Sequence, residues 1–124
     1  MSSPEIEVHK AIVSWLGYAL PADSLVHHSP NEGRHNVAWR AKQKRMGMQA
    51  GWPDLEIFVA PKHFKRPLFN FAPIFLEVKS DKGKLSKKQR AVLEKLRTLG
   101  AHAAVVRSID DARAFLNEII EVHA

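Results

Sequence analysis

Apolar and polar positions follow two different periods along this chain, and these periods predict where helices and strands lie. Apolar residues recur every three or four positions over residues 4–20 and again after residues 85 and 108, which is typical of amphipathic helices. Runs rich in β-branched and aromatic residues predict strands at 25–28, 55–59, 74–79 and 102–107. A helix is also predicted from about residue 36 to Gly47. This order of elements predicts an α/β fold with a central mixed β-sheet flanked by helices.

The first predicted helix carries a possible functional acid in its first turn. Ser3 can cap this helix and Pro4 suits its first position. Glu5 prolongs the apolar stripe of Val8, Ile12, Trp15, Leu16 and Ala19. Two interpretations of Glu5 stay open: it complements the helix dipole, or it points over the edge of the core as an active-site carboxylate. We expect His9, one turn further on, to be solvated.

The stretch from residue 51 to residue 79 holds the candidate chemistry. Asp54 opens one predicted strand, while Glu77 and Lys79 lie near the end of the next. Strand alternation places Glu77 and Lys79 on one face, roughly 6–7 Å apart, and pairing of the two strands would bring Asp54 within reach. Two carboxylates beside an ammonium group suit phosphodiester hydrolysis, because hard oxygen ligands hold Mg²⁺ or Mn²⁺. The lysine can orient a water or neutralise charge on the phosphate.

These residues carry a resemblance to a known family. Pro53-Asp54 followed by Glu77-Val78-Lys79 resembles the PD-(D/E)XK nuclease signature. Three segments in the matching order make the resemblance more specific, namely residues 28–34, 46–54 and 85–89. Together they make the chain similar, over nearly its whole length, to a stand-alone VRR-Nuc domain, the virus-type replication-repair nuclease group of that superfamily.

The resemblance implies a restriction-endonuclease-like core and a metal-dependent DNA endonuclease. It implies that Asp54, Glu77 and the carbonyl of Val78 bind Mg²⁺ or Mn²⁺, and that Lys79 lies at the attacking water. It also favours the catalytic interpretation of Glu5, since nucleases of this superfamily often carry a glutamate on the first helix.

Gln89 has two interpretations. Ser86 and Gln89 form a Ser-x-x-Gln capping box at the start of a helix that ends at Gly100. Yet Gln89 shares a helix face with Leu85, Val92, Leu96 and Leu99 and should point toward the strand that holds Lys79. The family pattern also has glutamine here. We therefore favour a role in the active site, where it would orient water or substrate phosphate.

The charge of the chain favours a polyanionic partner. Its net charge is +6 and its pI is near 9.8. The segment 34–46 contains no acid, and eight basic residues accompany two acidic ones between Lys79 and Arg97. We expect DNA contacts from Arg34, Arg40, Lys44, Arg45, Lys82, Lys84, Lys87 and Lys88. Asn31 either orients a phosphate or site carboxylate or holds its own turn, and Trp52 is expected to pack beneath the site rather than stack on a base.

Length and composition fit a single domain. A chain of 124 residues supports one hydrophobic core, so residues 1–124 are expected to form one nuclease-like domain. The absence of cysteine excludes a disulfide framework and a thiolate nucleophile. No signal-peptide pattern or bilayer-length apolar run occurs, which predicts a cytoplasmic protein without a membrane partner.

The resemblance also implies a homodimer that resolves four-way (Holliday) junctions. Two symmetric nicks require two active sites, and a two-fold pair of chains would supply them. The Phe64–Phe71 loop and Trp39 offer apolar surface for such a dimer, unless those aromatics fold back on their own core. Two other functions remain open, a non-catalytic nucleic-acid-binding module with the same fold and a DNA exonuclease.

Overall fold

Four strands form one mixed β-sheet in this computed structural model, which describes residues 3–29, 36–66 and 72–123. The strands are β1 (Ser24–His28), β2 (Leu55–Val59), β3 (Ile74–Val78) and β4 (His102–Val106), in the spatial order β1-β2-β3-β4. β1 and β2 pair antiparallel, as do β2 and β3, whereas β3 and β4 are parallel. The predicted α/β fold with a central mixed sheet is confirmed.

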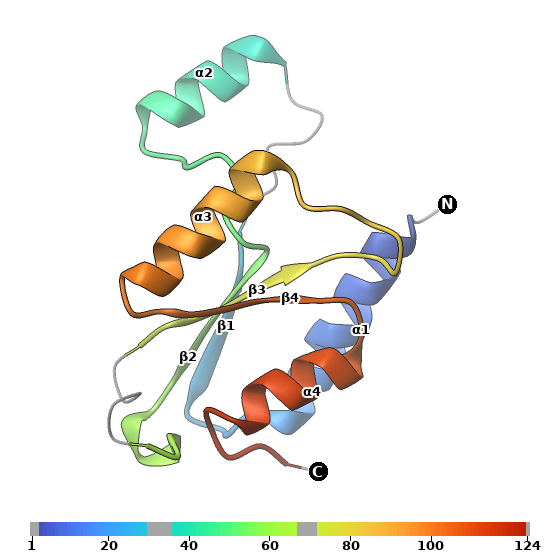
Figure 1. The fold of residues 1–124 in the computed structure, drawn as a ribbon, viewed down its shortest axis with the longest axis vertical. Coiled ribbons are helices and arrows are strands. Elements are labelled where there is room, and N and C mark those ends of the chain that lie inside the picture. Colours follow the sequence, from blue (N-terminus) through green and yellow to red (C-terminus); the bar gives the residue numbers. More distant parts are fainter. Residues whose placement is uncertain (1–2, 30–35, 67–71, 124) are drawn as a thin grey trace.

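Helices cover both faces of the sheet (Figure 1). α1 (Pro4–Ala19) and α4 (Ile109–Asn117) pack together on one face, and α3 (Lys87–Thr98) packs on the other. Alternate residues of β3 serve these two layers: Leu76 belongs to the core beneath α1 and α4, and Phe75 to the smaller core beneath α3. All five residues of β3 are therefore buried.

The helix ends follow the chemistry of the sequence. The Ser3 hydroxyl accepts the Ile6 N–H at 3.2 Å, and Pro4 fills the first helical position of α1. Ser108 caps α4 in the same way, accepting the Asp111 N–H at 3.0 Å. Leu99, predicted on the inner face of α3, is instead 72% exposed, because it is the C-cap residue beyond the last turn.

The segment after β2 folds back on the domain. A short 3-10 helix covers Pro61–His63, and Phe64 then forms an isolated β-bridge with Ile120 and packs against the larger core. Of the four aromatics predicted as open dimer surface, Phe64 thus packs on its own chain's core and Trp39 is partly buried, while Phe69 and Phe71 lie outside the described residues. Within the described ranges no helix is long and apolar enough to cross a membrane.

α2 (Val37–Arg45) stands apart from these layers (Figure 1). The Asn36 side chain caps it by accepting the Trp39 N–H at 2.7 Å. Gly47, with a φ of 101°, follows its last turn as predicted. None of the nine residues of α2, all within the described part of the chain, is buried.

Candidate active site

The β2–β3 hairpin brings Asp54 and Glu77 together. Leu55 pairs with Leu76 in the antiparallel register, so the preceding Asp54 lies opposite Glu77. The Oδ2 atom of Asp54 accepts the backbone N–H of Val78 at 2.7 Å, which fixes the carboxylate at the end of β3. The predicted pairing of the two strands is confirmed, and it places two acids from distant parts of the sequence at one point.

Glu77 is a buried acid. Its residue is 1% exposed, and its Oε1 atom has no hydrogen-bond partner among the described residues. Burial first, then a hydrogen bond and the negative charge of Asp54, raise the pKa of Glu77 to about 9, against a smaller lowering by Lys79. When no metal ion is bound, Glu77 therefore holds its proton at neutral pH.

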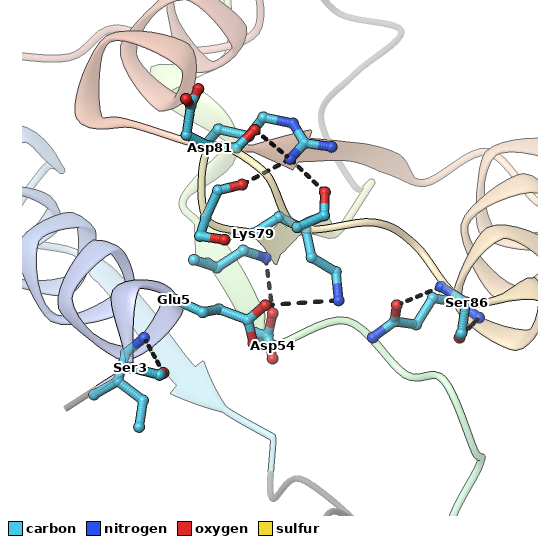
Figure 2. Close-up of polar contacts among 12 residues, drawn as sticks. Ser3, Glu5, Asp54, Lys79, Asp81 and Ser86 are labelled. Atoms are coloured by element: carbon cyan, nitrogen blue, oxygen red, sulfur yellow. Dashed lines mark hydrogen bonds and ion pairs between the residues drawn. The ribbon is translucent and has the colours of Figure 1, made fainter. Parts of the chain in front are cut away.

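Lys79 and Glu5 complete a charged cluster with the two acids. Lys79 is 8% exposed, and its Nζ atom lies 3.7 Å from Oε1 of Glu5 in the first turn of α1. Figure 2 shows Glu5, Asp54 and Lys79 pointing toward one another from α1, the start of β2 and the end of β3. Glu5 therefore lies at the site, as its catalytic interpretation requires, while it also occupies the helix turn where an acid complements the dipole.

Gln89 is engaged in the cap of α3. Its Oε1 atom accepts the Ser86 N–H at 2.9 Å, and the Ser86 hydroxyl accepts the Gln89 N–H at 3.1 Å. This is the complete capping box that the sequence pattern predicts. The amide oxygen of Gln89 is therefore used in capping α3. A role in catalysis stays a prediction, and it would require the amide nitrogen.

Gly51 joins the loop before Asp54 to the start of α3. Its φ is 80°, a conformation that favours glycine. A Cβ atom added there would meet the Lys88 carbonyl carbon at 2.7 Å and the Gln89 backbone nitrogen at 2.8 Å. Close contact of two backbones thus sets the position of α3 relative to Asp54.

Trp52 packs against the sheet but stays half open. Its ring meets Phe75 edge to face, with centroids 5.5 Å apart, and 36% of the residue is exposed. Its Nε1 donates to Oε1 of Glu56 at 2.8 Å, an atom that also accepts the Ser29 hydroxyl at 3.1 Å. Trp52 is therefore not the core residue that was expected: it lies at the edge of the sheet, outside both cores, and is anchored by Glu56, which the sequence did not suggest.

His9 is not the solvated residue that was expected. It is half-buried, and its ring meets that of His28 at a centroid distance of 4.7 Å. Burial, followed by the charge of His28, lowers the pKa of His9, while Asp54 and Glu5 act in the opposite direction. Packing of α1 against the end of β1 brings this histidine to the edge of the site, a contact that helical periodicity alone does not reveal.

Arg107 supports the turn that follows Lys79, and sequence reasoning missed it. Its Nη1 atom donates to the carbonyl oxygens of Gly83 at 2.6 Å and Ser80 at 2.7 Å (Figure 2), with a longer contact to Asp81 at 3.4 Å. The arginine comes from the end of β4, beside β3. Its only signal in the sequence is a basic residue at the end of a buried strand.

The residues predicted to contact DNA fall into three groups. Arg40, Lys44 and Lys88 line a groove between α2 and α3, whereas Arg45 does not. Lys82, Lys84 and Lys87 are on the exposed segment between Lys79 and α3, or at its first helical position. Asn31 and Arg34 lie outside the described residues.

The donor set at the site fits a divalent cation. Two carboxylates converge beside the Val78 backbone, and the buried Glu77 oxygen lacks a partner that a cation would supply. Among the described residues, no group of three or more His, Cys, Asp or Glu side chains is placed to hold a metal ion together. A set of two carboxylates and a carbonyl suits Mg²⁺ or Mn²⁺, which keep several waters and also bind substrate phosphate.

A mixed sheet between helices, with two acids and a lysine at the ends of adjacent strands, defines a nuclease domain with a restriction-endonuclease-like core. The VRR-NUC domain model matches residues 5–110, and the chain belongs to this family. It is also similar to a solved structure described as a VRR_NUC domain protein, with 27% identity and a TM-score of 0.69 over 95% of this chain and 88% of that chain. No curated protein matches the chain.

Proposed function

We propose that this VRR-NUC domain is a metal-dependent, structure-selective DNA endonuclease that hydrolyses phosphodiester bonds. The observation that carries the proposal is the convergence of Asp54, Lys79 and Glu5 around the buried Glu77. Membership of the VRR-NUC family makes the domain a nuclease. The choice of metal, the endonuclease action and the individual roles of the residues are our proposal.

Asp54, Glu77 and the Val78 carbonyl would hold Mg²⁺ or Mn²⁺. When bound, the ion supplies polarisation of the phosphoryl oxygen and a more acidic water. Lys79, held by Glu5 on the rim of the cluster, orients the attacking water and neutralises charge that develops on the phosphate. Glu5 fixes the ammonium group, and the Gln89 amide nitrogen is placed to contact water or phosphate from the first turn of α3.

The direct test compares single variants of purified protein. We expect Asp54→Ala and Lys79→Ala to abolish Mg²⁺- or Mn²⁺-dependent cleavage with unchanged circular dichroism, while Glu7→Gln, an exposed acid two residues from Glu5, keeps it. Full activity in either site variant, or cleavage in excess EDTA, would overturn the assignment. Metal-independent gel shifts without cleavage would favour the binding module, and failure on circular DNA would favour an exonuclease.

Metal binding can be tested apart from activity. Because the Glu77 carboxyl is buried and its oxygen lacks a partner, a cation should raise the melting temperature of the wild-type protein. Glu77→Gln keeps the shape of the side chain but removes the anionic ligand, so the increase in melting temperature with Mn²⁺ should disappear. An equal increase in both proteins would contradict metal binding at Glu77.

We further propose that two chains act together on four-way junctions. Symmetric resolution needs two nicks, and each chain has one candidate site. Open apolar surface for a second copy lies at Leu25 and Phe58, paired across β1 and β2, which are 72% and 46% exposed. We expect a dimeric mass by light scattering and paired nicks in a mobile junction. A monomeric mass with unpaired nicks would exclude this arrangement.

A further inference from the structure

A basic groove runs between α2 and α3, beside the candidate active site. Its volume is about 710 Å³. Arg40, Lys44 and Lys88 provide cations along it, while Ala41, Ala91 and Val92 provide apolar surface. None of the described residues that line the groove is acidic. The groove therefore combines positive charge with an apolar lining.

α2 lacks the packing that normally stabilises so short a helix. It has nine residues, and isolated helices below about 12–15 residues are only marginally stable in water. Val37, on the side that faces the groove, is 73% exposed. Helices of globular proteins gain most of their stability by packing an apolar stripe. Val37 and Ala41, one turn apart on α2, line an open groove instead, where a bound ligand would complete their packing.

The loop before Asp54 connects the groove to the site. Gln49 and Ala50 line it, and the next residue, Gly51, contacts the backbone of Lys88 and Gln89. Asp54 follows three residues later. One loop thus lines the groove, contacts the first turn of α3 and leads to Asp54.

We propose that this groove binds an unpaired DNA strand adjacent to the cleaved phosphodiester, an inference that rests on the proposed DNA endonuclease function. Phosphates contact Arg40, Lys44 and Lys88, and exposed bases lie on the apolar lining. Proteins that hold single strands combine a positively charged groove with surfaces on which bases lie, most often aromatic rings; in this groove the surface is aliphatic. A duplex keeps its base faces stacked inside and has nothing to place on Ala41, Ala91 and Val92. Within branched DNA, the groove thus selects substrates whose strand next to the cleaved bond is unpaired, including four-way junctions in which base pairs at the crossover have opened.

The charge contribution is tested with two lysines on one helix. Lys44 lines the groove, whereas Lys42 lies about 200° away around the helix and does not. We expect Lys44→Gln to weaken binding of a fluorescent single-stranded oligonucleotide in EDTA and to reduce the salt slope by about 0.7. Lys42→Gln should bind as the wild type does. Equal weakening by both variants would show that binding depends only on the overall positive charge, and it would contradict binding of the strand in the groove.

The apolar contribution is tested by filling the groove without changing charge. Ala91 is an exposed residue within α3, where leucine is well tolerated. We expect Ala91→Leu to weaken single-strand binding roughly fivefold, comparable to losing one base contact, and to leave blunt-duplex binding unchanged. A parallel loss for single strand and duplex, or no loss for either, would overturn the assignment to an unpaired strand.

These measurements separate the groove from the nuclease proposal. Binding in EDTA needs no catalysis, so the predicted differences between variants can appear even if the wild-type protein cleaves nothing. That result would support the groove and contradict the nuclease proposal. If the wild-type protein cleaves DNA but every variant binds the single strand as the wild type does, the nuclease proposal is supported and the groove is contradicted. Circular dichroism of each variant establishes that the fold is kept.

Discussion

Glu77 is an ionisable side chain in an almost fully buried position, which costs free energy unless a partner offsets it. The structure gives it a second acid, Asp54, and a nearby lysine, Lys79. The negative charge of Asp54 disfavours ionisation of Glu77, so the cluster does not by itself offset the burial of the Glu77 carboxylate. Such a destabilising arrangement is typical of a functional site, where a cation or substrate supplies the compensation.

Gly51 provides a residue-scale prediction. Gly51→Ala should destabilise the fold, since its Cβ would meet the α3 backbone at 2.7–2.8 Å in addition to the strain of a φ of 80°. Gly100→Ala is the matched control, since Gly100 has a φ of 97°, a Cβ there meets no described atom within 4 Å, and the residue does not line the groove. Denaturant titration should show a loss of about 1–2 kcal/mol for the control, from strain alone, and a larger loss for Gly51→Ala.

The same pair of variants should differ in activity. A shifted Gly51 moves α3 relative to Asp54, so cleavage should fall for Gly51→Ala and stay near the wild-type rate for Gly100→Ala. Equal stability losses and equal rates would show that the contact with Lys88 does not matter.

At the scale of elements, the site forms where four elements end. The first turn of α1, the start of β2, the end of β3 and the first turn of α3 meet there. Each element alone presents one or two polar groups, and the hairpin register and the packing of α1 bring them together. The turn after β3 has no regular structure of its own, so its shape depends on Arg107 from β4.

Arg107→Met should loosen this turn without unfolding the sheet. The variant keeps the side-chain stem but removes the donor to the Ser80 and Gly83 carbonyls. The Gly83 N–H, which donates to the Ser80 carbonyl at 3.1 Å, should exchange faster with solvent. The cleavage rate should fall about ten- to a hundredfold, as expected for a displaced neighbour of Lys79.

Arg113→Met is the control for that prediction. Arg113 is on α4, away from the turn. It pairs with Asp110 and lies over the ring of Trp15 on α1. Its variant should leave both Gly83 exchange and the cleavage rate unchanged. Unchanged exchange in Arg107→Met would show that the turn holds its shape without the guanidinium group.

At the scale of the whole molecule, the sheet separates two cores of unequal size. The larger lies beneath α1 and α4, and the smaller beneath α3. α2 adds no buried residue to either core. The free energy of unfolding therefore resides in the sheet and three helices, and α2 is expected to open independently of them.

In mild acid His102 should lower the stability of the whole molecule, while Glu77, whose pKa is raised to about 9, acts in the opposite direction. Burial lowers the pKa of His102 below its ordinary value of 6.5. Below that value the unfolded chain binds a proton that the folded chain does not, so the free energy of unfolding decreases as pH falls. Thermal melts of wild type and His102→Gln between pH 7 and pH 5 should differ, with the wild type losing stability relative to the variant as pH falls, because Glu77 acts equally in both proteins. His9, whose pKa is also lowered, leaves some slope; parallel curves would contradict a contribution from His102.

The sequence by itself determined the elements and the chemical candidates. Helix periodicity, capping residues and β-rich runs are local signals, and the strand Leu55–Val59 has the bounds that were predicted. The order of elements was sufficient for the α/β class, since it allows few arrangements of a mixed sheet. The short motif around Asp54 and Glu77 was sufficient to predict the two acids, because its residue types and spacing can be recognised without any knowledge of contacts.

Only the tertiary structure decided how those candidates meet. The β2–β3 register set Asp54 opposite Glu77, and coverage of both sheet faces buried Glu77. Chain folding likewise returned Phe64 to its own core and brought Arg107 to the turn beyond β3. Each of these contacts joins residues far apart in sequence, and its strength depends on burial and geometry. Local periodicity contains neither, because it records which face of an element is apolar and not which element that face will meet.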